Sequence, residues 1–255
     1  MRVAGRGRIL VWEGASLWVL VSDGKEAGTS LHAHHAHQIT LSLEGAFLLS
    51  DHARVRKGPV SAVAADHQHG FAAYGKVAFL FVEPESTAGR AISARFADGS
   101  PMTDLDPAPF APAIADLLAC HAADSPDGDF ITIGYALLAA LGGEARPADL
   151  NAKVKAMIDY VRTNLDGAVK LASAAGIACL SPSRARHLFA EETGLPFKAF
   201  VLWLRLERAV ACYAAGHSLT EAAHLAGFAD SAHLSRTFRK TFGLRASQLE
   251  LNGRR

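Results

Sequence analysis

The stretch TEAAHLAGFADSAHLSRTFRKTFGL, at residues 220–244, decides the fold of the last third of this chain. A similar stretch, LASAAGIACLSPSRARHLFAEETGL, lies at residues 171–195, and its Gly194 recurs 49 residues later as Gly243. Each copy predicts a short Ala-rich helix, a turn and a capped helix with Arg or Lys on its polar side. That is the layout of a helix-turn-helix, whose second helix enters a DNA major groove. Two tandem copies therefore predict two DNA-reading helices.

In the first copy, residues 171–178 form the expected supporting helix, and Ser181 caps the helix that Pro182 opens. Serine accepts hydrogen bonds from the free backbone N–H groups there, and proline suits a first turn because its missing N–H loses nothing. We expect Leu188 and Phe189 in the core. Residues near the start of such a helix reach the DNA. The candidate DNA contacts are Ser183 and Arg184 in the groove, with Arg184 suited to guanine, and Arg186 and His187 at phosphates.

In the second copy, Ser218 caps the expected helix at residues 219–226, Gly227 permits the tight turn, and Asp230 caps the reading helix. The apolar side chains of this copy are assigned to the core, namely Phe228, Leu234, Phe238 and Phe242. The candidate groove residues are Ser231, His233 and Ser235, with Ala232 placed to touch a thymine methyl group. The candidate phosphate contacts are Arg236, Arg239 and Lys240.

One long helix is expected at residues 197–214, between the two motifs, after a first helix at residues 153–164. A rise of 1.5 Å per residue makes the long helix span ~27 Å. Successive major grooves on one face of B-DNA lie ~34 Å apart. The long helix can therefore hold the two reading helices in neighbouring grooves, with side-chain reach or DNA bending covering the difference.

The charge is unevenly divided along the chain. Residues 1–149 hold 11 Lys and Arg against 17 Asp and Glu, a net charge of −6, whereas residues 150–255 hold 15 against 8, a net charge of +7. Such a division suggests that the basic part meets a polyanion. The two motifs lie inside that basic part.

At these residues the chain resembles the AraC/XylS family of bacterial transcription regulators. The resembling stretches are LSPSRARHLFAEETGLPFKAFVLWLRLERA and SLTEAAHLAGFADSAHLSRTFRKTFGL, and LRLERA at residues 204–209 is particularly characteristic. The resemblance implies sequence-specific DNA binding by both reading helices. It places Ser183, Arg184 and His187, and Ser231, Ala232, Ser235 and Arg236, at DNA-facing positions.

The first part of the chain reads as β-structure, with short apolar runs broken by Gly, Asp and Pro. Strands are expected at residues 9–12, 17–22, 38–43, 46–49, 60–64 and 77–82, which suits a small barrel or sandwich. Linkers are expected at residues 98–109 and 146–151. The expected fold class is an all-β cupin-like barrel with a helical pair, followed by an all-α domain. The domains are a sensor at 1–97, a linker and helical segment at 98–150, and a DNA-binding domain at 151–255.

Histidines gather in this β part, where LHAHHAHQITLSLEG at residues 31–45 resembles the first cupin motif. The resemblance makes His32 and His34 the His-x-His pair, places Gln38 where the family has Glu, and takes His67 or His69 from the second motif. These five residues are candidates for binding an effector or a metal, and imidazoles suit zinc, iron, nickel or copper. A small-molecule pocket without metal is the other alternative, and no other cofactor is expected. His35 and His37 are expected to face solvent.

Two helices are expected at residues 109–123 and 130–141, separated by SPDGD. In the resembled family such helices commonly pair subunits. Their leucines, Leu117, Leu118, Leu137, Leu138 and Leu141, suit either a homodimer interface or the core of one subunit.

No apolar run reaches the ~18 residues of a membrane span, and Glu13 interrupts the first apolar stretch, so neither membrane nor secretion is expected. The three cysteines, Cys120, Cys179 and Cys212, are widely spaced and are expected to be buried hydrophobes in a reducing cytoplasm.

These features predict a cytoplasmic, homodimeric transcription regulator that binds double-stranded DNA and a small-molecule effector and is not an enzyme. The alternative is a metal-dependent cupin enzyme with an appended DNA-binding module.

Overall fold

The computed structural model describes residues 5–22, 27–96, 99–142 and 149–251. The chain divides into two compact units, of which one comprises residues 1–147 and 237–255 and the other residues 148–236. The predicted segment 98–150 is not separate, since its described helices belong to the first unit. Part of the second predicted linker, residues 146–148, lies outside the described residues.

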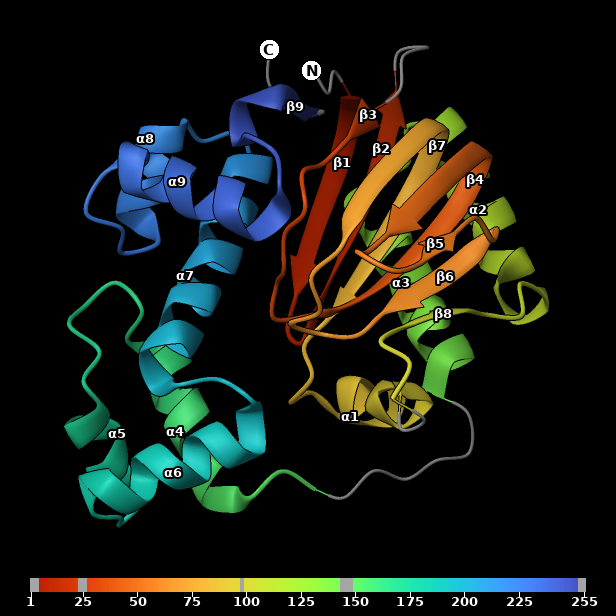
Figure 1. The fold of residues 1–255 in the computed structure, drawn as a ribbon. Coiled ribbons are helices and arrows are strands. Elements are labelled where there is room, and N and C mark those ends of the chain that lie inside the picture. Colours follow the sequence, from red (N-terminus) through yellow and green to blue (C-terminus); the bar gives the residue numbers. More distant parts are fainter. Residues whose placement is uncertain (1–4, 23–26, 97–98, 143–148, 252–255) are drawn as a thin grey trace. The chain divides into compact units, whose positions relative to one another are not determined.

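The first unit contains one sheet, which the described strands form in the order β8-β6-β4-β7-β2-β1-β9, with β3 paired to β7 and β5 to β4 (Figure 1). The strands are β1 (Gly5–Trp12), β2 (Ala15–Ser22), β3 (Ala27–Gly28), β4 (His37–Ser50), β5 (Val55–Arg56), β6 (Val60–Val63), β7 (Gly70–Val82), β8 (Met102–Asp104) and β9 (Leu249–Leu251). These pairs are antiparallel except β1 with β9, which is parallel.

Two sequence expectations about strands are wrong. The strands expected at 38–43 and 46–49 are one strand, β4, whose register with β7 shifts between Ser42 and Glu44. Gly45 interrupts the apolar pattern there because it lies opposite Gly75 with a positive φ of 98°, which favours glycine. The linker expected at 98–109 contains β8, which pairs with β6.

Side chains alternate between the two faces of the sheet, as strand geometry requires. Leu17 and Val19 belong to the hydrophobic core that the sheet shares with its helices, while Trp18 and Leu20 line a pocket. The same alternation holds along β7. The helices of this unit are α1 (Thr87–Ser93), α2 (Ala111–Ala122) and α3 (Asp127–Gly142), and α2 and α3 lie behind the sheet in Figure 1.

The leucines of α2 and α3 take part in this core. Leu117, Leu137 and Leu141 are buried in it, and Leu118 and Leu138 pack against it half-buried. Of the two roles that the sequence left open for them, packing within one subunit is therefore the one seen here.

The second unit is helical, and α9 begins in it and ends in the first unit. The helices are α4 (Ala152–Thr163), α5 (Leu171–Ile177), α6 (Pro182–Thr193), α7 (Phe197–Ala214), α8 (Leu219–Leu225) and α9 (Ser231–Phe242). The long helix α7 has the bounds expected from the sequence and connects the two helix-turn-helix pairs (Figure 1).

The helix caps follow the sequence. Ser181 accepts a hydrogen bond from the Arg184 N–H, and Ser218 forms a capping box with Glu221. Asp230 Oδ1 accepts from the His233 N–H at 2.5 Å. Each cap satisfies backbone donors that the first turn of a helix leaves free.

Among the helices that the structure describes, none has the length and hydrophobicity of a membrane span. The expectation of buried cysteines is wrong for Cys179, which is exposed and adopts a φ of 53° in the turn after α5. Cys120 and Cys212 are half-buried.

Candidate functional site

The N-terminal half of α6 presents polar side chains to solvent. All four predicted contact residues of this helix are exposed, namely Ser183, Arg184, Arg186 and His187. Leu188 and Phe189 are buried, and Phe189 packs against the rings of Phe197 and Phe200. The helix is thus held by its apolar face, so that its first turns are available to a partner.

The second reading helix, α9, is amphipathic in the same way. Leu234 and Phe238 are buried. Among the predicted contact residues, Ala232, Arg236, Arg239 and Lys240 are exposed, and Ser231, His233 and Ser235 are half-buried. The basic residues therefore lie on the face opposite the core.

One of these candidates has a packing role as well. The ring of His233 lies 5.1 Å from that of Phe228, in an edge-to-face arrangement. Phe228 itself is buried at the turn. His233 therefore covers the turn, which limits its reach towards a groove.

Arg205 of α7 has a positioning role that the sequence analysis did not assign. Its Nε donates to the Leu165 carbonyl at 3.1 Å, and its Nη2 donates to the Gly167 carbonyl at 2.8 Å. Gly227, with a φ of 77°, also lies close to the Leu165 carbonyl. A Cβ at this position would lie only 2.5 Å from the Leu165 oxygen. The only hint in the sequence was Arg205's place in LRLERA.

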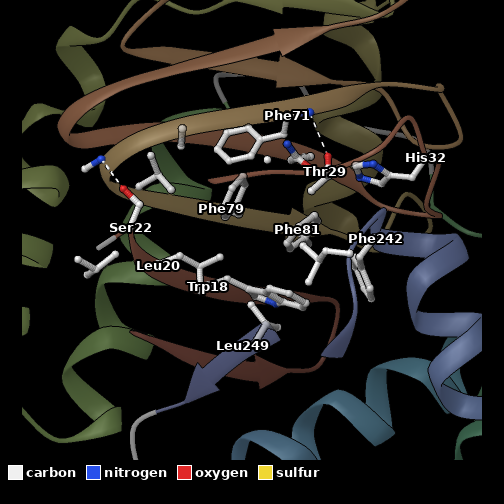
Figure 2. Close-up of a pocket in the computed structure, with 17 residues that line it drawn as sticks. Trp18, Leu20, Ser22, Thr29, His32, Phe71, Phe79, Phe81, Phe242 and Leu249 are labelled. Carbon is white, nitrogen blue, oxygen red and sulfur yellow. Dashed lines mark hydrogen bonds between the residues drawn. The ribbon is translucent and has the colours of Figure 1, made fainter. Parts of the chain in front are cut away.

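A pocket lies in the first unit, on the sheet face opposite the core that the sheet shares with α2 and α3 (Figure 2). Its lining is mostly aromatic and aliphatic, and includes Trp18, Phe71, Phe79 and Phe81 from β2 and β7. Polar groups are few, among them His32 and Gln38. Phe242, Leu244 and Leu249, at and beyond the end of α9, also line it. Such a lining suits a largely apolar small molecule.

Beside this pocket, three histidines come together. His32, His34 and His69 are buried, and one ring nitrogen from each lies within 4.8 Å of the others. The backbone bridge between His32 and His69 holds their two segments side by side. Gln38 reaches the same place, with Oε1 at 3.1 Å from His34 Nε2 and 3.2 Å from His69 Nε2.

Burial keeps these histidines neutral. Loss of solvent lowers the pKa of His34 to about 3 and that of His69 to about 2, and it also lowers the pKa of His32. Neutral imidazole is the form that binds metals.

His67 lies outside the cluster, since its Nε2 is 3.0 Å from Asp51 Oδ2. The resemblance to the second cupin motif left His67 and His69 as alternatives, and the structure places His69 in the cluster. The predicted solvent positions of His35 and His37 are wrong, because both are buried. His37 contacts Ser93 Oγ at 2.9 Å.

Two carboxylates face the buried side chain of His35. It lies 2.9 Å from Asp66 Oδ2 and 3.3 Å from Glu85 Oε2. Burial opposes its charge, but its contacts with these two carboxylates outweigh burial and raise its pKa to about 9. A pKa of about 9 favours the protonated, cationic form of His35 near neutral pH.

Comparisons with known proteins agree with this architecture. A family model described as a helix-turn-helix domain matches residues 174–251. An apo ToxT variant from Vibrio cholerae strain SCE256 has a TM-score of 0.60 and 12% identity, covering 93% of this chain and 97% of that chain. ToxT from Vibrio cholerae O395 bound to (E)-4-(8-methylnaphthalen-1-yl)but-3-enoic acid has a TM-score of 0.59 and 10% identity, covering 92% and 98%.

Unsaturated fatty acid bound ToxT from Vibrio cholerae strain SCE256 has a TM-score of 0.56 and 12% identity, covering 92% and 95%. No curated protein sequence matches the chain. At these identities the solved structures show a common fold. They confirm the predicted class, a β-sheet domain followed by a helical helix-turn-helix region.

Proposed function

We propose that this AraC-family regulator reads double-stranded DNA with the first turns of α6 and α9 and takes a small-molecule effector into the pocket of its β-sheet unit. The observation that carries the proposal is the doubled reading helix. Both α6 and α9 are N-capped, buried along one face, and exposed where DNA-contact residues are expected.

In each reading helix, some side chains contact base edges and others contact phosphates. Arg184 lies near the start of α6, where a guanidinium can donate two hydrogen bonds to a guanine edge. Arg186 and His187 in α6, and Arg236, Arg239 and Lys240 in α9, are the phosphate contacts. Ser183, Ser231, Ala232 and Ser235 touch groove edges, with His233 a weaker candidate.

The effector is a mainly apolar molecule. The aromatic lining of the pocket favours such a ligand, and the ligands named for the ToxT structures are a fatty acid and a naphthalenyl butenoic acid. An occupant of this pocket touches Phe242, the last residue of α9. Effector binding is thereby linked to the second reading helix, and linkage makes DNA change effector affinity by the same factor.

The regulator works as a homodimer in the cytoplasm, where its DNA lies. The outer face of α3 suits subunit pairing, because Tyr135 is 56% exposed there. Light scattering of the purified chain should give the mass of a dimer.

Selection of bound sites from random double-stranded DNA tests the proposal. The full chain should enrich a site with two conserved blocks about 10 base pairs apart, one for each reading helix. Affinity for that site should fall steeply with salt, with a log-log slope of about −0.9 per phosphate contacted. If no sequence is enriched, with or without a metabolite extract, the proposal is wrong.

A further inference from the structure

The three clustered histidines all use the same ring nitrogen to bind the backbone. Nδ1 of His32 lies 2.8 Å from the Ser30 carbonyl, that of His34 lies 3.1 Å from the Ala36 carbonyl, and that of His69 lies 2.9 Å from the His67 carbonyl. A carbonyl oxygen only accepts hydrogen bonds, so each Nδ1 carries the proton. A neutral imidazole has one N–H, which leaves a lone pair on every Nε2.

The Oε1 atom of Gln38, which lies beside these Nε2 atoms, is also a hydrogen-bond acceptor. Gln38 Nε2 donates to Thr40 Oγ1 at 3.0 Å, and this bond turns Oε1 towards His34 and His69. Oε1 and the two Nε2 atoms therefore face one another with no proton between them. Facing lone pairs repel in a buried place, and a cation among them would turn that repulsion into attraction.

We infer that His32, His34 and His69, with Gln38, bind a divalent transition-metal ion and that this ion controls the second reading helix. Imidazole nitrogens suit Zn²⁺, Co²⁺ or Ni²⁺, whereas Mg²⁺ and Ca²⁺ prefer sets of oxygen ligands. Metal-binding histidines usually donate their other N–H to a carbonyl or carboxylate, as all three do here. Since the four donors are neutral, the ion keeps its charge beside the pocket that His32 and Gln38 also line.

The path from the ion to α9 runs through Ser30. His32 donates to the Ser30 carbonyl, and Ser30 donates through its N–H and its hydroxyl to the carbonyl of Gly243, the residue after α9. A ligated His32 has a fixed ring, so the ion stiffens this connection. This regulatory role rests on the proposed function of α9, whereas ion binding itself does not.

One other arrangement satisfies the same four residues without an ion. If the Gln38 amide turned over, its Nε2 would donate to both His34 and His69, and its oxygen would accept from Thr40. A Gln38→Glu variant separates the two arrangements. A carboxylate is a stronger metal ligand than an amide, so metal affinity should rise by about tenfold or more at a metal site.

The binding test is a titration of chelator-treated full-length protein with Co²⁺, followed by its visible absorption. We expect one ion per chain, displaced by Zn²⁺ and not by equal Mg²⁺. His69→Gln should abolish the band, while the control His67→Gln should keep it, because the His67 side chain pairs with Asp51. Thermal unfolding of both variants verifies folding. Absence of the band in the natural chain overturns the metal site, even if Gln38→Glu shows one, because the added carboxylate could create a site that Gln38 does not provide.

The regulatory test measures affinity for the selected DNA site with Zn²⁺ and with chelator. We expect a change of about 5–150-fold in the natural chain, and none in His69→Gln. Ser30→Ala, which removes one bond to Gly243, should bind Co²⁺ normally and show a smaller change. Equal DNA affinity in both conditions overturns the regulatory role. Absence of DNA binding in both, with Co²⁺ still bound, contradicts the proposed function and leaves the metal site standing.

Discussion

Ser30 holds Gly243 with two hydrogen bonds, one from its backbone N–H at 3.1 Å and one from its hydroxyl at 3.0 Å, both to the Gly243 carbonyl. Gly243 ends the second reading helix with a φ of 69°, and a Cβ on it would lie 2.4 Å from the Ser30 carbonyl oxygen. The backbone at Ser30, just before the histidine cluster, therefore packs directly against the backbone at Gly243, at the end of α9.

Substituting Gly243 by Ala should therefore destabilise the chain more than the same change at Gly194. Gly194 is the corresponding residue of the first motif, with a φ of 75°, but a Cβ on it would have no atom within 4 Å. The left-handed backbone costs an alanine about 1–2 kcal/mol at either place, and overpacking adds about 1–3 kcal/mol at Gly243. Thermal unfolding measures both variants, and equal losses would contradict the close fit.

Arg184 should read a base, and Arg186 should not. Arg184→Ala is expected to lose about 1–3 kcal/mol of preference at one base pair of the selected site. Arg186→Ala should weaken binding to all sequences alike and lower the salt slope by about one. Competition binding with single-base variants of the site measures both. A uniform loss with Arg184→Ala would make it a phosphate contact instead.

Arg205 should matter for stability more than its neighbour Arg208. Arg205 is bonded to two backbone carbonyls, whereas Arg208 pairs at 3.2 Å with Asp166, whose side chain is 68% exposed. Arg205→Ala should cost about 1–3 kcal/mol because the carbonyls of Leu165 and Gly167 lose a charged donor. Arg208→Ala should change the unfolding temperature little, because exposed ion pairs contribute little. Similar shifts for both would remove the positioning role of Arg205.

Asp230 should have opposite effects on stability and on DNA affinity. Its carboxylate caps α9 through the His233 N–H, yet its charge repels nearby phosphates. Asp230→Ala should lose about 1 kcal/mol of stability, while Asp230→Asn keeps the cap. Asp230→Asn should bind DNA more tightly than the natural chain at low salt, since it removes the repulsion. Filter binding and thermal unfolding give the two quantities, and weaker binding by Asp230→Asn would contradict this assignment.

The buried ion pair of His35 with Glu85 predicts a loss of stability at alkaline pH. The pKa of His35 is raised to about 9 from 6.5, so its contribution is complete below pH 6.5 and disappears as the pH rises through 9. Denaturant unfolding at pH 6.5 and pH 9.5 should show a decrease of a few kcal/mol. In His35→Gln this decrease should be absent, and its persistence there would assign the loss to other groups.

The helical part could be predicted closely because its signals are local. Ser181, Ser218 and Asp230 mark helix starts through their own side chains, and α7 has the expected bounds. Parts of the β domain could not be predicted, because pairing partners lie far apart in sequence. The three-residue strand β9 pairs with β1 across nearly the whole chain, and no periodicity marks so short a strand.

The histidine-rich segment was predicted in part. Alternation suggested that His32 and His34 share a face, and the structure brings them together with His69. The same alternation placed His35 and His37 in solvent, which is wrong because Glu85 and Ser93, distant in sequence, cover them. The part of the pocket lined by Phe242 had no signal in the sequence either, since Phe242 was predicted to belong to the core of a helical domain.

Hydroxyl-radical footprinting of the full chain on its selected site shows whether α6 and α9 read two neighbouring grooves of one duplex. We predict two protected segments about 10 base pairs apart, with Arg184→Ala weakening one and Arg236→Ala the other. A single protected segment, or one that both substitutions weaken equally, would contradict that arrangement.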